Sequence, residues 1–368
     1  MGRKAVSKFA YCNMIVFTFI VAVITLVGAY VQNVSPDQSG ILPFIGLSLS
    51  FLLVFNLILV LYWALRLRVW FVVPLLAIVG NYQYIGRIFR PFSSDTAISP
   101  TENVLKVATF NADSFGKEWT ACVTKDYARF MDAKAVDILC FQEFGKGSES
   151  YPLDSICKAF KKWPYHVIPS SPRGKNYLQL AVFSKYPIKD SVLIPFKGTA
   201  NCAMHCDIEV GRGRVLRLFN VHFQTTSASA HMKEIRESVQ GLDIFTKAIY
   251  GVSYLAYDMQ NNFSMRGEQA DYIKAKVKES PYPVILCGDF NSIPSSYTYH
   301  TILGNDLQDG FTSVGKGYMY TFRYLKRLLR IDYIMSSLQF KPLEYYSPHN
   351  EFHSDHNPVV MSMKWVGK

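Results

Sequence analysis

The chain has 368 residues, 49% of them hydrophobic, and a formal charge of +11 at pH 7. The first ninety residues contain seven Lys or Arg and one acidic residue, so they carry +6 of that charge. The remainder is more evenly balanced and is long enough for one large domain. The overall basicity is therefore poor evidence for nucleic-acid binding, although a mildly basic domain suits an anionic ligand. Seven scattered cysteines, an odd number, argue against a disulfide scaffold.

Residues 1–90 are predicted to be a membrane region. Residues 14–31 and 41–65 are long, uncharged and apolar, and each is sufficient to cross a bilayer. Residues 69–85 are shorter and contain Pro74 and Gly80, so they are a marginal third span. The alternative for the first segment is a cleaved signal peptide, but its length and the second span directly after it favour integral helices.

The basic residues of this region predict its orientation. Three of them precede the first span: Arg3, Lys4 and Lys8. They hold the amino terminus in the cytoplasm, and Arg66 and Arg68 return to that side between the second and third spans. Three spans then place the rest of the chain outside the cytoplasm, whereas two would place it inside. Arg87 and Arg90 weaken the three-span prediction. The expected location is the cell (inner) membrane, with the large domain extracytoplasmic.

Residues 91–103, rich in Ser, Thr and Pro, are predicted to be a linker, and residues 104–368 one catalytic domain. Apolar, β-branched runs predict strands at 104–110, 135–141, 180–183, 192–196, 204–210, 215–221, 283–287, 332–335 and 358–363. A helix is expected at 124–135, and a polar, partly helical region at 227–278. Strands outnumber helices and few βαβ units repeat, which indicates an α+β sandwich of two or four layers.

Two cysteine pairs have different interpretations. Cys140 and Cys287 lie inside apolar runs and are expected in the core. Cys202 and Cys206 are four apart, so a zinc site or a disulfide between them is conceivable. No second Cys or His pair follows at zinc spacing, which disfavours the metal site.

Five short strings place polar or ionisable groups together, and the first four follow predicted strands. They are Thr109-Phe110-Asn111, Phe141-Gln142-Glu143, Asn220-Val221-His222, Gly288-Asp289-Phe290-Asn291 and Ser354-Asp355-His356. Any one of them alone could be an ordinary turn, since Asn and Asp favour turns. Together they supply carboxylates for a hard cation, a base for water and donors for developing charge, as phosphate ester cleavage requires.

With these strings, the chain resembles the endonuclease/exonuclease/phosphatase superfamily as a membrane-anchored, bacterial-type member. The likeness covers about residues 104–365 and includes residues 110–113 and 330–333 besides the strings above. It implies the deoxyribonuclease I-like fold, a four-layer α/β/β/α sandwich. The first ninety residues have no counterpart in the soluble members.

The resemblance implies an essential Mg²⁺, with Mn²⁺ as a substitute. Glu143 matches the metal-binding glutamate, and Asn111 matches an asparagine that holds phosphate or metal. Asp355 and Asp113 match acidic residues near the metal, although Asp113 could equally cap a turn.

The resemblance also implies the reacting groups. Asp289 matches the aspartate that activates the attacking water, and Asn291 and His356 match groups that contact the phosphate. Asp332 matches the buried partner of His356, which favours its protonated form.

His222 matches a general acid for the leaving group, although a histidine at a strand end is often a plain surface residue. Family members with a deoxyribonuclease-like site support this histidine with a glutamate. The corresponding position here is Gln179, which puts its strength as an acid in doubt.

The substrate is expected to be a phosphoester: a lipid head group, a small phosphoester or nucleic acid. Arg173, in the basic loop 172–176, is placed to contact an anion or is a solvated turn. Residues 323–330 carry four basic residues among apolar ones and suit a membrane surface, a phosphate backbone or an ordinary packed segment.

The main hypothesis is a membrane-anchored, Mg²⁺-dependent phosphodiesterase or phosphomonoesterase that uses an Asp-activated water in in-line attack. The alternatives are an extracytoplasmic endonuclease or exonuclease and an inactive phosphoester-binding module. The intact motif residues argue against the inactive module. The sequence gives no sign of an obligate protein partner.

Overall fold

The computed structural model describes residues 3–92, 104–170, 179–211, 213–226, 244–349 and 352–367. Only the backbone is described for residues 3–6 and 244–250. Arg173 with its loop and most of the predicted linker lie outside the described residues.

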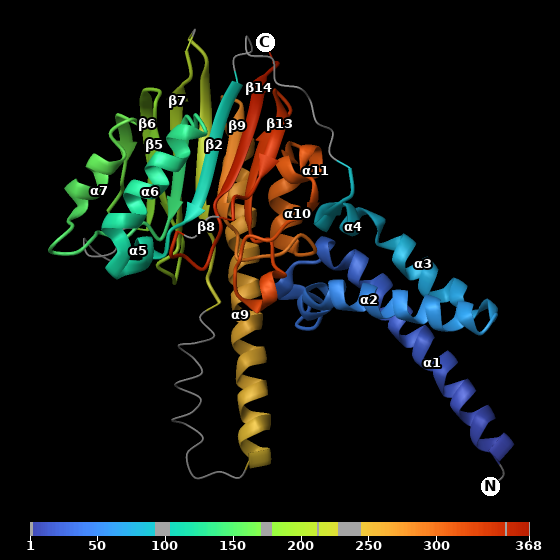
Figure 1. The fold of residues 1–368 in the computed structure, drawn as a ribbon. Coiled ribbons are helices and arrows are strands. Elements are labelled where there is room, and N and C mark those ends of the chain that lie inside the picture. The colour runs from blue at the N-terminus through green and yellow to red at the C-terminus, as the bar shows by residue number, and fades with distance from the viewer. Residues whose placement is uncertain are drawn as a thin grey trace.

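Two six-stranded sheets lie face to face (Figure 1). The first contains, in spatial order, β13 (Phe340–Tyr346), β14 (Val359–Trp365), β2 (Val104–Asn111), β3 (Ile138–Gln142), β5 (Leu180–Ser184) and β4 (Tyr165–Val167). The second contains β10 (Leu307–Asp309), β12 (Asp332–Ser337), β9 (Val284–Asp289), β8 (Val215–His222), β7 (Cys202–Glu209) and β6 (Ile188–Pro195). Their facing side chains form one fully buried apolar core.

Helices cover both outer faces, which confirms the four-layer α/β/β/α sandwich. α6 (Thr120–Ala133) and α7 (Leu153–Ala159) pack on the first sheet through an aromatic-rich cluster. α9 (Ile244–Lys278) and α10 (Tyr297–Leu303) pack on the second sheet. Cys140 and Cys287 are fully buried core residues, as expected. Cys202 and Cys206 are also buried and are free thiols, so they form no disulfide with each other.

The strand directions bring several strand ends to one rim. β2 and β3 are parallel, as are β8 and β9, so their carboxyl ends meet at the same edge. β12 and β14 run antiparallel to them and contribute their amino ends there. The sequence strings that follow β2, β3, β8 and β9 are therefore collected on one side of the sandwich.

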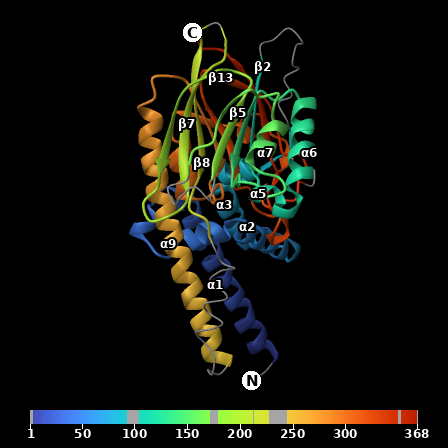
Figure 2. The same cartoon turned by 90° about the vertical axis from the view of Figure 1, so that its left-hand side faces the viewer.

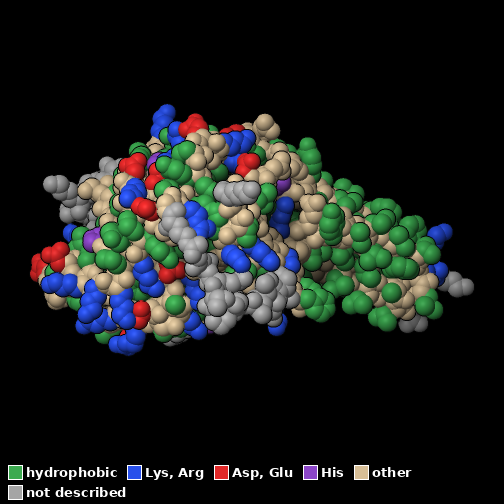
Figure 3. All heavy atoms as spheres, turned by 90° about the horizontal axis from the view of Figure 1, so that it is seen from above, with side chains coloured by type: hydrophobic (Ala, Val, Ile, Leu, Met, Phe, Trp, Pro, Cys, Tyr) green, Lys and Arg blue, Asp and Glu red, His purple; other side chains and the backbone are tan. Residues whose placement is uncertain are grey.

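The N-terminal region contains α1 (Arg3–Tyr30), α2 (Leu42–Leu65), α3 (Val72–Gly80) and α4 (Tyr82–Ile88). Two helical segments, Ser7–Asn33 and Leu42–Leu65, are long and apolar enough to cross a membrane. Segments Val69–Gly80 and Tyr82–Ile88 form a pair bent by 60°, which provides a third crossing if they act as one span. Figure 3 shows the outside of these helices as a nearly continuous apolar surface with basic side chains at its tip.

Polar side chains join these apolar helices to one another. Trp63 Nε1 of α2 donates to Thr18 Oγ1 of α1 at 2.9 Å. Asn81, at the bend between α3 and α4, donates to the Thr25 carbonyl of α1 at 3.0 Å. The bent pair therefore runs against the same bundle, as a third span would.

Candidate metal and phosphate site

Backbone geometry fixes the ends of β8 and β9 at the rim. His222 is paired with Asp289 in the parallel register, and Asp332 faces Asp289 from the antiparallel side. Gly288 has φ 139°, and a Cβ there would lie 1.9 Å from the Val221 carbonyl oxygen. Only glycine permits this approach of the two strands, which explains the glycine that precedes Asp289.

Asn111 joins the acidic groups of the two sheets. Its Nδ2 donates to Asp289 Oδ2 at 3.0 Å and lies 3.3 Å from Glu143 Oε1. Asp289 Oδ1 accepts from the backbone N–H of Asn291 at 2.8 Å. Residues from the ends of β2, β3 and β9 thus form one cluster, which places Asn111, Glu143, Asp289 and Asn291 together as the sequence indicated.

Several residues of this cluster have a left-handed backbone. Glu143 has φ 47°, Asn291 has φ 48° and Asp113 has φ 39°. Non-glycine residues seldom adopt such angles, and they concentrate at ligand and active sites where the surrounding structure holds them. The residues directly after the ends of β3 and β9 are thus among those with this unusual backbone.

His356 is held as an imidazolium by buried carboxylates. Its Nδ1 donates to Asp332 Oδ2 at 2.9 Å, and its Nε2 lies 3.8 Å from Asp289 Oδ2. Burial alone would lower the pKa of His356, but the charges of Asp332 and Asp289 outweigh it and raise the pKa to about 10. Burial in turn raises the pKa of Asp289 to about 6, against the opposing effect of His356.

His222 has the opposite character. Its Nδ1 lies 2.9 Å from Gln179 Oε1. The neutral amide of Gln179 therefore occupies the position of the supporting glutamate, as the sequence match indicated. A carbonyl oxygen only accepts, so Nδ1 carries the proton and Nε2 faces Glu143 and Asp289 at 3.7 Å without one. Burial lowers the pKa of His222 to about 4. The side chain is 1% exposed, so it is not a plain surface residue.

The other acidic residues surround Glu143 and suit a divalent cation. Burial, and then the charges of neighbouring carboxylates, raise the pKa of Asp113. Burial likewise raises the pKa of Glu143, with Asp355 adding to the effect. This crowding of like charge in a partly buried place is what an oxygen-ligated cation relieves.

A tighter group is formed by Asp289, Asp332 and His356, whose ligand atoms all lie within 4.8 Å of one another. A protonated imidazole cannot ligate a cation, and Asp332 is already engaged with Nδ1 of that ring. The triad is therefore a hydrogen-bonded group of ion pairs that offers no free imidazole ligand to a cation.

Three contributors had no role predicted from the sequence. Ser354 Oγ donates to the Asn111 carbonyl at 2.7 Å and accepts from the His356 N–H at 3.0 Å, so it fixes the C-terminal string to β2. Phe322 packs against the His356 ring at 5.2 Å. Arg266 of α9 is 2% exposed, lines the same cavity and donates to the Gln224 carbonyl. Ser354 lay inside a recognised string, whereas Arg266 had no motif around it.

The basic segment 323–330 lies at the mouth of the site. Arg323 and Arg327 line a hollow of about 490 Å³ together with Asp113 and Asp355. Leu325 is 65% exposed beside them. The segment therefore presents both cations and apolar side chains next to the rim.

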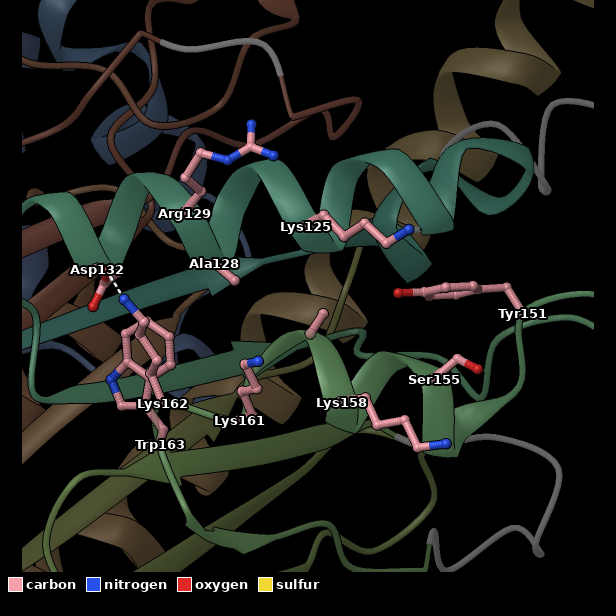
Figure 4. A pocket seen from close by; sticks show the side chains of 11 residues that line it. Lys125, Ala128, Arg129, Asp132, Tyr151, Ser155, Lys158, Lys161, Lys162 and Trp163 are labelled. Atoms are coloured by element: carbon pink, nitrogen blue, oxygen red, sulfur yellow. Dashed lines mark hydrogen bonds and ion pairs between the residues drawn. The ribbon is translucent and has the colours of Figure 1, made fainter.

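A separate basic hollow lies between α6 and α7 (Figure 4). It measures about 500 Å³, and Lys125, Arg129 and Lys158 line it. None of the described residues of the metal and phosphate cluster lines this hollow, so its charges are not part of the site.

Comparisons with known proteins agree with this geometry. A family model described as the endonuclease/exonuclease/phosphatase family matches residues 108–356. A second model, described as a domain of unknown function, matches residues 9–88. No curated protein matches the chain significantly.

Solved structures share the fold at low identity. An endonuclease/exonuclease/phosphatase from Bacteroides vulgatus is 18% identical, with a TM-score of 0.51, 72% of this chain and 100% of that one covered. A family protein from Leptotrichia buccalis is also 18% identical, with a TM-score of 0.51 and coverages of 71% and 99%. D. rerio TDP2 complexed with a single-strand DNA product is 15% identical, with a TM-score of 0.52 and coverages of 72% and 100%.

Proposed function

The chain belongs to the endonuclease/exonuclease/phosphatase family, and we propose that it is a membrane-anchored, Mg²⁺-dependent phosphoester hydrolase. Members of this family are generally metal-dependent phosphoester hydrolases or nucleases. We place a Mg²⁺ ion, which Mn²⁺ can replace, at Glu143 and Asn111 with Asp355 and Asp113 near it. When bound, such an ion neutralises charge that develops on the phosphate oxygens.

Asp289 is the proposed base for the attacking water. Its raised pKa, about 6, leaves it ionised at neutral pH but close enough to that pH to take a proton. The Asn111 amide and the Asn291 N–H hold both carboxylate oxygens in place. In in-line attack, the water oxygen forms the new P–O bond and its proton passes to Asp289. The bond to the ester oxygen breaks, and that oxygen leaves with the bonding electrons and takes a proton from solvent.

His356 is the proposed donor to the phosphate. Asp332 fixes its ring and keeps it protonated, so Nε2 presents an N–H beside Asp289. Asn291 borders the same cavity and is proposed to contact the phosphate as well. Donors held in advance for developing negative charge are worth about 10²–10³ in kcat.

His222 is assigned a different role from the general acid that the resemblance implied. With its proton on Nδ1 and a pKa of about 4, it has no proton to give from Nε2 at neutral pH. A cation beside Glu143 would lower that pKa further. We propose that Nε2 accepts a hydrogen bond from Thr225, which lies 3.2 Å away, or from a bound water.

One observation supports this proposal most directly: Asn111 touches both Glu143 and Asp289, 32 and 178 residues away in sequence. In the full-length protein, we expect Mg²⁺-dependent release of p-nitrophenol from bis(p-nitrophenyl) phosphate. Glu143→Ala or His356→Ala should lower kcat by about 10² or more, because each removes charge stabilisation. The exposed Glu149→Ala is the matched control, and loss of activity there equal to Glu143→Ala would contradict the assignment.

A nuclease is the second candidate. The structural likeness to TDP2 bound to a single-strand DNA product favours it. Cutting of plasmid or single-stranded DNA as fast as the nitrophenyl ester would support the nuclease. Binding of phosphate without hydrolysis of any ester would instead support the inactive binding module.

We also propose that the protein is an integral protein of the cell membrane with its catalytic domain outside the cytoplasm. Two apolar helices support the anchoring, and the bent pair supports a third crossing.

A further inference from the structure

The cavity that contains the metal and phosphate site continues between the catalytic domain and the N-terminal helices. It has a volume of about 730 Å³. Glu143, Asp289 and His356 line one part. Val31, directly after α1, and Leu47, near the start of α2, line another. The reacting groups therefore share one space with apolar side chains of the membrane region.

The wall contributed by the N-terminal region is held in place by specific contacts. Ser295 Oγ donates to the Gly46 carbonyl at 2.9 Å, and Gln260 Nε2 donates to the Pro36 carbonyl at 2.7 Å. The ring of Phe44 packs edge-on against Phe263 of α9 at 5.4 Å. The segment between α1 and α2 and the start of α2 are thus fixed against the catalytic domain.

A second hollow of about 540 Å³ extends the first along α2. Three apolar residues line both hollows, so the hollows adjoin at these side chains, which we call the neck: Leu47, Ile293 and Leu329. The second hollow is lined further on by Val54 and Leu57, which are 57% and 52% exposed. Apolar lining is therefore continuous from the cavity of the site to the outer face of a predicted membrane span.

The lining distinguishes between substrate classes. Among the described residues that line the two hollows, the Lys or Arg residues are Arg266 and Arg330, whereas Arg323 and Arg327 line the neighbouring hollow at the mouth. Arg330 is paired with Asp309 at 2.8 Å, and its side chain is 2% exposed. A nucleic acid needs rows of Lys and Arg along its backbone, whereas a hydrocarbon chain needs the Leu, Ile and Val found here.

Two helices that project from the sandwich, α1 and α9, also favour contact with lipid. Figures 1 and 2 show α1 and the first half of α9 extending from the same end of the sandwich. Val252 and Tyr257, on that half of α9, are 69% and 66% exposed. Apolar and aromatic side chains at this end suit a lipid surface.

We infer that the substrate is a lipid phosphoester whose hydrocarbon chain occupies the neck and the second hollow, which is the groove along α2. This inference rests on the proposed phosphoesterase activity. The phosphate lies among Asn111, Asp289 and His356, and the chain passes Leu47 toward the bilayer. The phosphate of the substrate then reaches the site while part of the hydrocarbon chain stays in the bilayer.

The test uses full-length protein in maltoside micelles and a series of alkyl p-nitrophenyl phosphate diesters with methyl, octyl and hexadecyl chains. All share one leaving group and one charge, so they differ only in the chain. Leu47→Trp fills the neck, and Leu61→Trp is the matched control, because Leu61 lies on α2 outside both hollows and is 56% exposed.

Since burial of each methylene is worth about fourfold in binding, even a partly buried chain should matter. We expect Leu47→Trp to lower the hexadecyl-to-methyl ratio of kcat/KM by about tenfold or more. Leu61→Trp should keep the wild-type ratio, and because all proteins are in the same micelle, partitioning of the substrate cancels. An unchanged ratio in Leu47→Trp, or equal losses in both variants, would overturn the inference.

A second measurement does not need catalysis or a substituted protein. Hexadecyl phosphate with a diazirine at the chain end should label Leu47, the buried Leu53 or residues 318–329 of the wild-type protein. Labelling confined to outward positions such as Ile58 and Leu61 would overturn the inference. If no ester is hydrolysed but the groove is labelled, the proposed activity fails while the lipid site stands.

Discussion

His222 and His356 show how one neighbouring atom sets the charge of a buried imidazole. In each ring, Nδ1 lies 2.9 Å from a side-chain oxygen. The oxygen belongs to the neutral amide of Gln179 in one case and to the carboxylate of Asp332 in the other. Burial opposes the charged form in both, and only the carboxylates around His356 outweigh it.

Exchanging these partners should exchange the charge states. Gln179→Glu should raise the pKa of His222 from about 4, and Asp332→Asn should lower that of His356 from about 10. The measurement is NMR titration of labelled imidazole carbons in metal-free protein. Gln308→Glu, the same kind of change away from the site, should move neither histidine. Unaltered titrations in both partner variants would disprove this account.

The raised pKa of His356 also links charge to folding stability. The unfolded ring titrates near 6.5, so its stabilising contribution is complete below about that pH and is lost as the pH rises toward 10. Metal-free protein should therefore lose stability between pH 7 and pH 9, by at most about 1.4 kcal/mol per pH unit from this group.

His356→Gln should reduce the loss of stability between pH 7 and pH 9. The measurement is the midpoint temperature of thermal unfolding as a function of pH, in buffer that contains a chelator. A wild-type slope no steeper than that of the variant would contradict the assignment.

At the scale of elements, a buried amide network joins the two sheets below the site. Gln142 Nε2 donates to Asn220 Oδ1 at 2.6 Å. Asn220 Nδ2 donates to the carbonyls of Phe141 and Ala181 at 3.0 and 3.2 Å. The network fixes the relative positions of β3, β5 and β8, and thereby of the side chains that follow them.

Asn220→Ala would leave these buried groups without partners and should lower the free energy of unfolding by about 2–4 kcal/mol. Chemical denaturation of the full-length protein will measure it. The exposed Asn305→Ala should change stability by less than about 0.5 kcal/mol. A similar small effect for Asn220→Ala would show that the network is not structural.

Sequence patterns predicted the strands that end in site residues better than the edge strand β13 and the end of α6. Each of four strands is an apolar run that ends in polar residues: β2, β3, β8 and β9. The apolar run predicts the strand, and the polar residues predict where it ends. β13 was missed because Pro342 and the charges of Lys341 and Glu344 hide the pattern of an edge strand. α6 ends at Ala133, two residues before its predicted end, because Ala135 adopts φ 55°.

The same distinction holds within the site. Short strings predicted Asn111, Glu143, Asp289 and His356 because each lies beside a strand end. Arg266 could not be predicted, because its place depends on how α9 packs and no short pattern encodes that contact. The wall formed by the N-terminal helices was equally unpredictable, since it joins residues more than 200 positions apart.

For the whole molecule, the structure explains two basic residues that weakened the three-span prediction. Arg87 contacts Gln32 and the Pro294 carbonyl and lies over the ring of Tyr299. Arg90 donates to the Thr312 carbonyl. Both cations are therefore used to dock the catalytic domain, so they have a structural role that is separate from the orientation of the spans.

The ends of α1 and α2 that contact the catalytic domain, and the end of α4, lie opposite the amino terminus, as three crossings require (Figure 1). A protein that fluoresces only in the cytoplasm should therefore be dark when fused after Lys368. The same reporter fused after Arg68, in the loop that the basic residues hold inside, should be bright. Bright cells with both fusions would mean two crossings. Two crossings would put the turn between α1 and α2 across the membrane from the catalytic domain, so this outcome would contradict the contacts of Pro36 and Gly46 and the groove along α2.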